Sequence, residues 1–182
     1  AATSFGATTV GQNLSVTASG SVSDTGKLAV AGTTGISAAG QTVTLDETTN
    51  DFTGAVTVTG GATTLKDAND LTVSLTTSGA TDLTAVDTLT LNGTVSGATS
   101  DLTTDAAATS FGATTVGQNL SVTATGAVSD TGKLAVTGTT GISSAGQTVT
   151  LDDAANDFTG AVTVTGGATT LNDANDLTVS LT

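Results

Sequence analysis

The sequence repeats itself with a period of 106 residues. Residues 1–76 return as residues 107–182, and only eight of the 76 aligned positions differ. None of the eight differences involves Val, Leu, Ile or Phe, so the pattern of large apolar residues is the same in both copies. Self-similarity at a fixed period is typical of repeat proteins, in which each unit buries its apolar face against its neighbours. The chain is therefore expected to be a piece of a tandem array.

Short units of alternating apolar residues recur inside each period. The clearest units are Leu14-x-Val16, Leu28-x-Val30, Val43-x-Leu45, Val56-x-Val58, Leu71-x-Val73-x-Leu75 and Leu89-x-Leu91. Weaker apolar positions lie between them at Val10, Val22, Ile36, Leu65, Leu83, Val95 and Leu102. A period of two predicts strands with one buried face, and no stretch has the apolar stripe of a helix. Clusters of Gly, Asp, Asn and Ser between the units favour tight corners.

These strands predict an all-β fold, a parallel β-helix (β-solenoid). Counting both sets gives roughly fourteen strands per period, or about five coils of about 20–25 residues with about three strands per coil. Residues 1–106 would form a first super-repeat and residues 107–182 a second, truncated one, in one continuous stack. The period also suits tandem immunoglobulin-like β-sandwiches, which remain an alternative. The absence of Trp, Tyr and Pro favours the solenoid.

Composition excludes several classes of function. The chain has 16 acidic and three basic residues and a formal net charge of −13, which argues against nucleic acids and anionic membranes as partners. No apolar run is long enough for a transmembrane helix. Without His or Cys, the usual nucleophilic triads, zinc sites and haem sites cannot form. Carboxylates alone remain for chemistry, so we predict that the protein is not an enzyme, with no catalytic or cofactor-binding residues.

Calcium is the one cofactor that the sequence suggests, because clustered oxygen ligands suit Ca²⁺. The candidate ligands are Asp46, Glu47, Asp51, Asp67 and Asp70, and their second-copy counterparts Asp152, Asp153, Asp157, Asp173 and Asp176. Neither the EF-hand spacing nor the GGxGxD repeat is present. Asp and Asn at corner turns explain the same clusters without a metal. A calcium-dependent rise in melting temperature would support the metal site.

Thr-x-Thr steps suggest a flat ice-binding face as a further hypothesis. Such steps occur at Thr42/Thr44, Thr57/Thr59 and Thr88/Thr90. A flat face needs coils in strict register, and the apolar units are unevenly spaced, at 13–18 residues. Exterior strand positions, which Thr favours, therefore explain these residues better. The four phenylalanines, Phe5, Phe52, Phe111 and Phe158, are expected to fill the core.

Three stretches of the sequence carry a family resemblance. They read NLSVTASGSVSDTGKLAVAGTTGISAAGQTVTLD, NDFTGAVTVTGGATTL and DANDLTVSLT. This repeat style resembles the β-strand repeats of bacterial filamentous-haemagglutinin-like exoproteins and related autotransporter passengers. The resemblance implies a right-handed β-solenoid rod, secretion across an outer membrane, and work as an adhesin or fibrous surface component.

Together these observations predict a structural segment of an extracellular bacterial surface fibre or filament, built from stacked β-solenoid repeats. The alternative is an adhesin repeat module that binds a host, a glycan or a neighbouring cell. The expected partners are copies of the chain or further repeats, joined end to end through open strand edges. The expected location is the bacterial cell surface.

Overall fold

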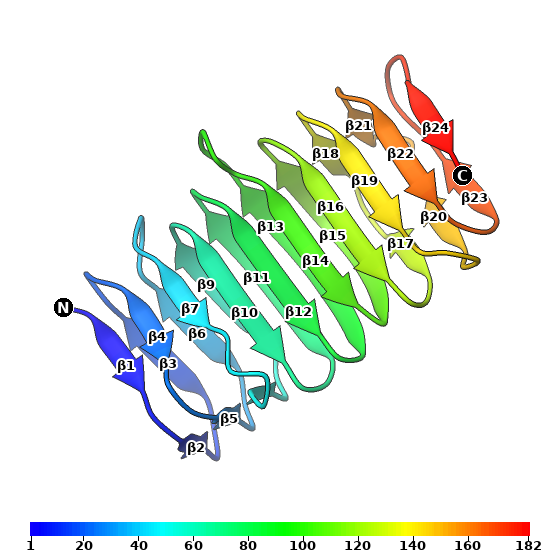
Figure 1. Ribbon diagram of the computed structural model, residues 1–182. Helices are drawn as coiled ribbons and strands as arrows, with labels where there is room; N and C mark the ends of the chain where they lie inside the picture. The colour runs from blue at the N-terminus through cyan, green and yellow to red at the C-terminus, as the bar shows by residue number, and fades with distance from the viewer.

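The chain winds into an elongated stack of β-strands. The computed structural model describes residues 1–182 and contains 24 strands and no helix. The strands are parallel and form a β-solenoid of about nine turns, with the two termini at opposite ends (Figure 1). The predicted all-β parallel solenoid is confirmed. The immunoglobulin-like alternative is wrong, because its strands would pair antiparallel. With no helix of any length, the structure contains none that could span a lipid bilayer.

Three sheets, here named A, B and C, contain all the strands. Sheet A has ten strands, in the spatial order β1 (Thr3–Phe5), β4 (Val22–Asp24), β7 (Val43–Leu45), β10 (Thr63–Asp67), β12 (Thr81–Ala85), β14 (Leu102–Ala106), β16 (Leu120–Ala124), β19 (Thr140–Ser143), β22 (Val162–Thr165) and β24 (Val179–Leu181). Sheet B has three, β2 (Thr8–Val10), β5 (Leu28–Val30) and β8 (Asp51–Phe52). Sheet C has eleven, β3 (Leu14–Thr17), β6 (Thr34–Ser37), β9 (Val56–Gly60), β11 (Leu71–Thr77), β13 (Thr88–Val95), β15 (Ala108–Val116), β17 (Val128–Asp130), β20 (Val149–Leu151) and β23 (Thr169–Leu171), with β18 (Leu134–Val136) and β21 (Asp157–Phe158) continuing from β15.

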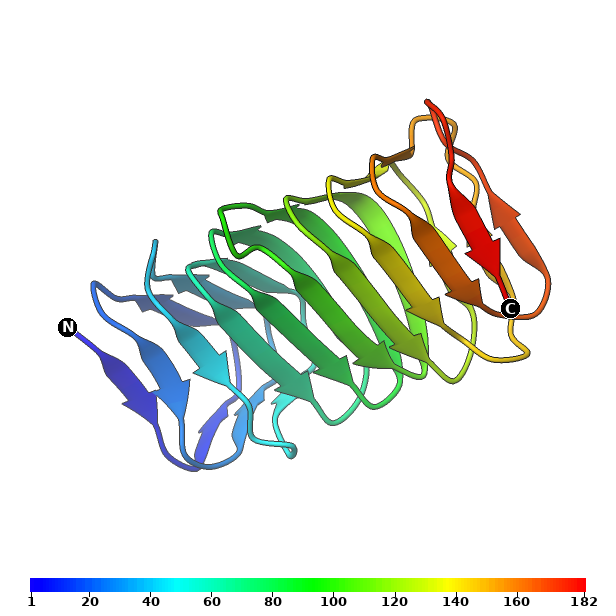
Figure 2. The ribbon, with the colours of Figure 1, turned by 45° about the horizontal axis from the view of Figure 1, so that its top comes forward.

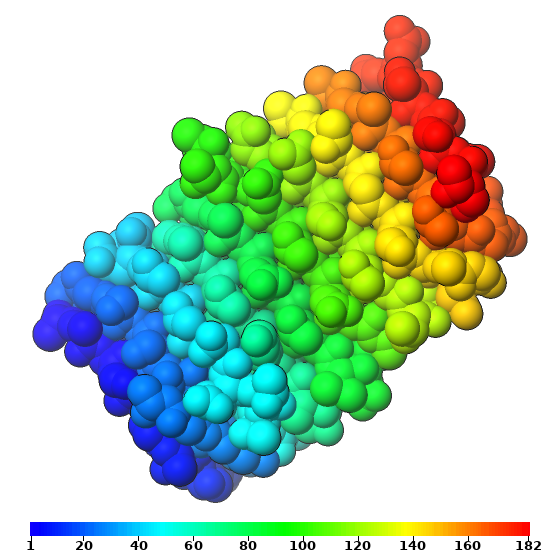
Figure 3. All heavy atoms as spheres, viewed as in Figure 1, coloured from blue at the N-terminus to red at the C-terminus, as the bar shows by residue number.

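Sheets A and C are the two long faces of the solenoid, and they run along its whole length (Figure 2). Paired residues on neighbouring strands of sheet A are between 17 and 22 positions apart in the sequence. Val162 and Val179 mark the shortest step, and Thr140 and Val162 mark the longest. The coils are therefore shorter than predicted: four of the nine steps fall below the expected 20–25 residues, and none exceeds 22. The space-filling view shows the coils following one another without a break from blue to red (Figure 3).

The number of strands per coil changes along the stack. Near the N-terminal end a coil consists of three strands, for example β4, β5 and β6. This is the number that the sequence predicts. In the middle a coil has only two, because β12 passes to β13 through Val86 and Asp87, with no short apolar strand between them. The strands there are correspondingly longer, up to nine residues in β15. Each coil in the middle of the stack thus consists of one strand from sheet A and one from sheet C.

Each strand of sheet A or C in the first copy recurs in the opposite sheet in the second copy. Strand β4 lies in sheet A and its copy β17 lies in sheet C, whereas β6 lies in sheet C and its copy β19 lies in sheet A. The cause is that 106 residues span about five and a half turns. Five successive strand pairings in sheet A lead from Thr3 to Leu102, which is five full turns. The copy of Thr3 is Thr109, which comes half a turn after Leu102 and therefore lies in sheet C. The period is not a whole number of coils.

The half turn also separates the short strands of the two copies. In Figure 1, β2 and β5 lie along the lower edge of the stack, whereas β18 and β21, the copies of β5 and β8, lie along the upper edge. The same corner of sequence is therefore displayed on opposite edges of the solenoid. A rod of such repeats would show each surface feature alternately on its two sides.

One continuous apolar core lies between the sheets. It contains 36 buried residues, almost all from the inward positions of the strands. Phe52, Phe111 and Phe158 are at most 2 % exposed, which confirms that they fill the core, while Phe5 packs at its N-terminal end and is half-buried. Burying each large apolar side chain contributes roughly 1.5–3 kcal/mol. The stability of the fold comes from stacking, because the strand edges and apolar side chains of each coil are covered by the neighbouring coils and not by the coil itself.

Candidate functional site

The main polar surfaces are the outward faces of sheets A and C. Four small hollows mark the surface, and the largest, about 290 Å³, lies at the C-terminal end. Strand pairing aligns the outward residues into columns with neighbours about 4.8 Å apart. The column along sheet A contains Ser4, Ser23, Thr44, Thr64, Asp82, Thr103, Ser121, Gly141, Thr163 and Ser180.

These columns correct one sequence argument. Uneven spacing along the chain was expected to prevent strict register, and this expectation is wrong, because the corners absorb the differences in coil length. The columns are interrupted instead by residues without a hydroxyl group and by one β-bulge. Asp82 and Gly141 break the run of hydroxyls in sheet A, and a bulge between Leu91 and Gly93 shifts the register in sheet C.

The two faces differ in charge. Sheet A carries Lys66, Asp82 and Asp105 at outward positions in its middle strands. The outward positions of β3, β6, β9, β11 and β13 in sheet C hold only Ser, Thr, Gly and Asn. In a chain with a net charge of −13, this is an uncharged hydroxyl-rich surface. It suits a neutral partner better than a cationic one.

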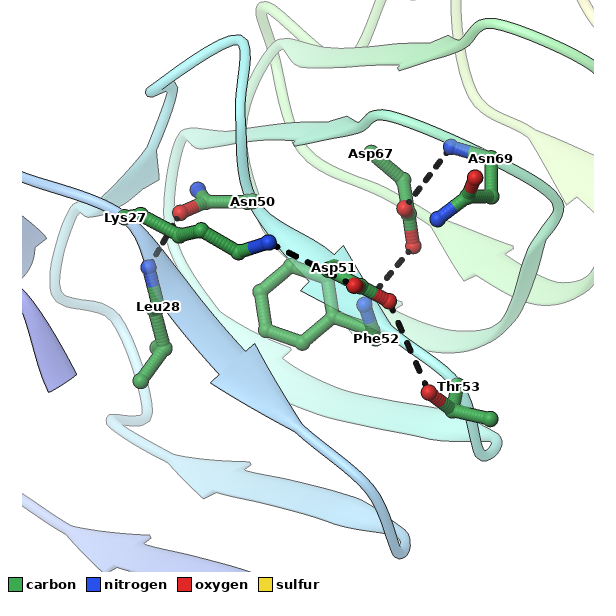
Figure 4. Close-up of polar contacts among 8 residues, drawn as sticks. All are labelled: Lys27, Leu28, Asn50, Asp51, Phe52, Thr53, Asp67 and Asn69. Atoms are coloured by element: carbon green, nitrogen blue, oxygen red, sulfur yellow. Dashed lines mark hydrogen bonds and ion pairs between the residues drawn. The ribbon is translucent and has the colours of Figure 1, made fainter. Parts of the chain in front are cut away.

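A buried amide holds the corner between β7 and β8. The Asn50 side chain is fully buried, and its Oδ1 accepts a hydrogen bond from the backbone N–H of Leu28 at 2.7 Å (Figure 4). Its Nδ2 donates to Asp24 Oδ2 at 2.6 Å. Asp24 Oδ1 also accepts from the N–H of Asp46. The network ties three successive segments together. It satisfies polar groups that would otherwise be buried without partners.

The second copy builds the same network on the opposite edge. Asn156 Oδ1 accepts from the Leu134 N–H at 2.7 Å, its Nδ2 donates to Asp130 Oδ2, and Asp130 Oδ1 accepts from the Asp152 N–H. Asp24 and Asn50 are 26 residues apart in the sequence. No local spacing links them, so sequence reasoning missed both residues. The register of neighbouring coils is what brings them together.

Replacing Asn50 with alanine should destabilise the fold by about 2–3 kcal/mol, because the Leu28 N–H would be buried without an acceptor. Asn156→Ala should cost a similar amount, since its contacts are the same. Urea unfolding followed by circular dichroism measures both, and Asn13→Ala at an exposed corner is the control. A cost below 1 kcal/mol for both buried variants would contradict the role given to the amide.

Two carboxylates, those of Asp51 and Asp67, lie close to the backbone of Phe52 (Figure 4). Asp51 Oδ2 is 3.5 Å from Lys27 Nζ, and the same pair recurs as Asp157 and Lys133, again at 3.5 Å. These ion pairs are partly exposed and contribute little, about 1 kcal/mol or less. Asp67 is only 2 % exposed; its Oδ2 accepts from the Phe52 N–H and its Oδ1 from the Asn69 N–H, each at 3.1 Å.

Burial raises the pKa of Asp67 from its ordinary value of 3.8 to about 6. Loss of water around the carboxylate is the main cause, and the hydrogen bonds from the Asn69 and Phe52 N–H groups oppose it. The negative charge of Asp51 adds to the rise. Folding therefore favours the protonated form of this side chain.

The free energy of unfolding should fall as the pH rises through 6. A raised folded-state pKa means that the folded chain binds the proton more tightly, so this stabilisation is fully present below about pH 4 and is lost above about pH 6. The loss should be roughly 2–3 kcal/mol, from about two pKa units. Asp67→Asn should shrink the difference between pH 4 and pH 7 by that amount in urea unfolding.

The matched control is Asp173→Asn, because Asp173 is the sequence counterpart of Asp67 but is only half-buried. Burial is the main cause at Asp67, so the control should change the pH dependence much less. Equal changes in both variants would show that general charge repulsion, and not the burial of Asp67, sets the pH dependence.

The ten calcium candidates have separate places in the structure. Asp51 and Asp157 pair with lysines, Asp67 and Asp173 accept from strand N–H groups, and Asp70 accepts from the Thr88 N–H at 2.8 Å. Asp46, Glu47, Asp152, Asp153 and Asp176 lie at exposed or half-buried corner positions. Nowhere do three or more acidic side chains come together in a group that could hold a metal ion. Calcium binding stays a prediction for the melting experiment.

The fold defines a parallel β-solenoid repeat protein. A family model for repeats of unknown function (DUF5649) matches residues 1–59 and 99–165, which is more than two thirds of the chain. The chain therefore belongs to this family of repeats. No curated protein and no solved structure matches the chain. The family match confirms that the chain is built from repeats, as the resemblance noted above implies. It does not show that the chain belongs to the filamentous-haemagglutinin-like exoproteins or the autotransporter passengers.

Proposed function

We propose that this chain is a structural segment of an extracellular bacterial surface fibre. The observation that supports the proposal best is the continuous pairing of sheets A and C from the first coil to the last, across both repeats. Such a stack resists bending and adds length with each coil, by about 4.8 Å per rung. The chain would act as a rod without catalytic activity.

Composition supports an exposed location. A net charge of −13 keeps rods apart in solution, and the absence of Cys leaves the fold independent of the redox state around it. The resemblance to bacterial surface repeats points the same way. Further repeats, or copies of the chain, would continue the rod through the open strand edges at its two ends.

Two measurements test the proposal. Electron microscopy of several 106-residue repeats joined in tandem should show stiff, unbranched rods that lengthen by about 25 Å with each repeat. Antibodies raised against the chain should label intact cells of the source organism as strongly as permeabilised cells. Labelling only after permeabilisation would refute the extracellular location, and compact round particles would refute the rod.

The uncharged face of sheet C favours a second candidate function, an adhesin module. Its Ser, Thr and Asn side chains offer hydrogen bonds to a neutral glycan without charge repulsion. Binding to a glycan array by the isolated chain would support this function. The matched test replaces Thr57 and Thr59 with aspartate, with Thr163→Asp and Thr165→Asp, their copies in sheet A, as the control. Loss of binding in the first variant alone would place the glycan on sheet C.

A further inference from the structure

One broad face of the solenoid is uncharged, and no other part of the chain covers it. It consists of the outward positions of β3, β6, β9, β11 and β13 in sheet C, and we call it the neutral face. These positions hold only Ser, Thr, Gly and Asn, and all of them are exposed or half-buried. Four of the five strands pair on both edges, so the face lies along the side of the stack and not at one of its ends.

Strand pairing arranges the side chains of the neutral face in straight columns. The longest column takes one hydroxyl-bearing residue from each of the five strands, Thr17, Ser37, Thr59, Thr76 and Thr94. Neighbours in a column are about 4.8 Å apart, and the next column lies two residues along the strand, at about 6.6 Å. The stacking of the coils therefore fixes the spacing of the hydroxyl groups over the whole face.

The neutral face has a shallow hollow over Gly35. The hollow holds about 220 Å³, and its lining includes Ser15 and Thr57 on the two neighbouring strands. Gly35 pairs with both of these residues and has no side chain to fill the space between them. The face therefore has small ridges and a depression, which the small side chains of a similar face can enter.

Charge decides which partner fits the neutral face. The chain has a net charge of −13, so two copies repel each other over most of their surfaces. Sheet A points Lys66, Asp82 and Asp105 outward, and a contact there would bring like charges together or strip water from them. The neutral face has no charge to repel or to desolvate. It is the broad face through which two copies can approach each other.

We propose that the neutral faces of two copies of the chain pack against each other, so that two solenoids lie side by side. Both faces have the same spacing between strands, so their columns stay in register over the whole contact. Small identical side chains interdigitate in the same way between the paired sheets of a steric zipper. This pairing rests on the proposed role of the chain as a segment of a rod, and it names a second rod as the partner.

The size of the neutral face predicts a weak contact between two single chains. Five strands about 4.8 Å apart, each with about three outward residues about 6.6 Å apart, cover roughly 500 Å², or about 1,000 Å² over both partners. This area lies at the low end for specific interfaces. Single chains should therefore associate only at roughly millimolar concentration. Salt should strengthen the association, because it screens the repulsion between the two anionic chains.

A rod of many repeats would carry this contact on both sides. The residues of β3, β6 and β9 recur unchanged in β16, β19 and β22, with the same pairing but in the opposite sheet. Successive repeats would therefore present this surface to alternate sides of the rod. Several weak contacts on linked repeats give a much stronger association than one contact alone. We therefore expect long rods to gather into bundles.

Two measurements on the full chain test the pairing. Sedimentation velocity detects association as the chain concentration and the salt concentration rise. Nuclear magnetic resonance of the threonine methyl groups locates the contact, because the signals of Thr59, Thr76 and Thr94 should shift with concentration. The signals of Thr44 and Thr64, which point outward from sheet A, should stay in place. Shifts spread evenly over both sheets, or confined to sheet A, would overturn the assignment.

A pair of charged variants supplies the matched control. Thr59→Asp with Thr94→Asp places two carboxylates on the neutral face, on either side of Thr76, where the carboxylates of the facing copy repel them. We expect association to weaken at least about tenfold. Ser23→Asp with Thr64→Asp adds the same charge at the same spacing on sheet A and should weaken association much less. Circular dichroism checks that both variants keep the fold. Equal weakening in both would mean that general repulsion is responsible, and it would overturn the pairing.

Failure of this pairing differs from failure of the rod. A chain that stays monomeric at every concentration and salt, with tandem repeats that appear as single separate rods in electron microscopy, would overturn the pairing and leave the rod in place. Compact round particles of the tandem repeats would refute the rod itself. Glycan binding by a chain that remains monomeric would overturn the pairing and assign the neutral face to the adhesin function.

Discussion

Replacing Phe111 with alanine should destabilise the solenoid by about 3–5 kcal/mol, whereas Phe5→Ala should cost much less. The two residues occupy the same position in the repeat. Phe111 is fully buried, and β15 pairs with β13 on one side and with β17 on the other. Phe5 is half-buried in the first strand, which pairs only with β4. Removing the ring therefore leaves a closed cavity at Phe111 and a partly open one at Phe5.

Urea unfolding followed by far-ultraviolet circular dichroism measures this difference, since the chain has no Trp or Tyr for fluorescence. Phe158→Ala, at a second buried position, is a further check and should resemble Phe111→Ala. Equal costs at Phe111 and Phe5 would mean that the end coil is as well covered as the middle, which would contradict the open N-terminal edge.

Gly93→Ala should be the other large effect, with a cost of at least about 2 kcal/mol. Gly93 has a φ of +116°, which side-chain-bearing residues rarely adopt. A β-carbon there would also overlap the carbonyl oxygen of Leu75 on the neighbouring strand. The substitution must therefore move β13 away from β11, at the bulge in the middle of sheet C.

The matched control is Gly35→Ala on the same sheet, where an added β-carbon meets nothing nearer than 4.0 Å. We expect a change within about 0.5 kcal/mol for this control. The same unfolding measurement serves both variants. A neutral Gly93→Ala would show that the backbone of β13 can relax, and that the close approach to Leu75 is not needed for pairing.

The strands themselves were predictable because their signal is local. Leu71-x-Val73-x-Leu75 alternates with polar residues, and its apolar side chains are buried in β11 as the period of two predicts. The weaker positions Val22, Ile36 and Leu83 also lie in strands, all buried. The networks of the candidate site were not predictable in this way. Asp24 meets Asn50 only because two coils stack in a particular register.

The sequence by itself determined the repeat and the inward positions of the strands, because alternation and glycine-rich corners act over a few residues at a time. The tertiary structure decided that the strands pair parallel and not antiparallel, because that pairing joins residues about 20 positions apart. The tertiary structure decided how many residues each turn consumes, and that number depends on how every corner packs on the coil below. As a result, the 106-residue period spans a half-integral number of turns, and identical sequences lie in opposite sheets. It also decided that two apolar side chains of the sequence DANDLTVSLT are buried at Val73 and Leu75 but exposed at their counterparts Val179 and Leu181, because burial depends on the next strand and not on the strand's own side chains.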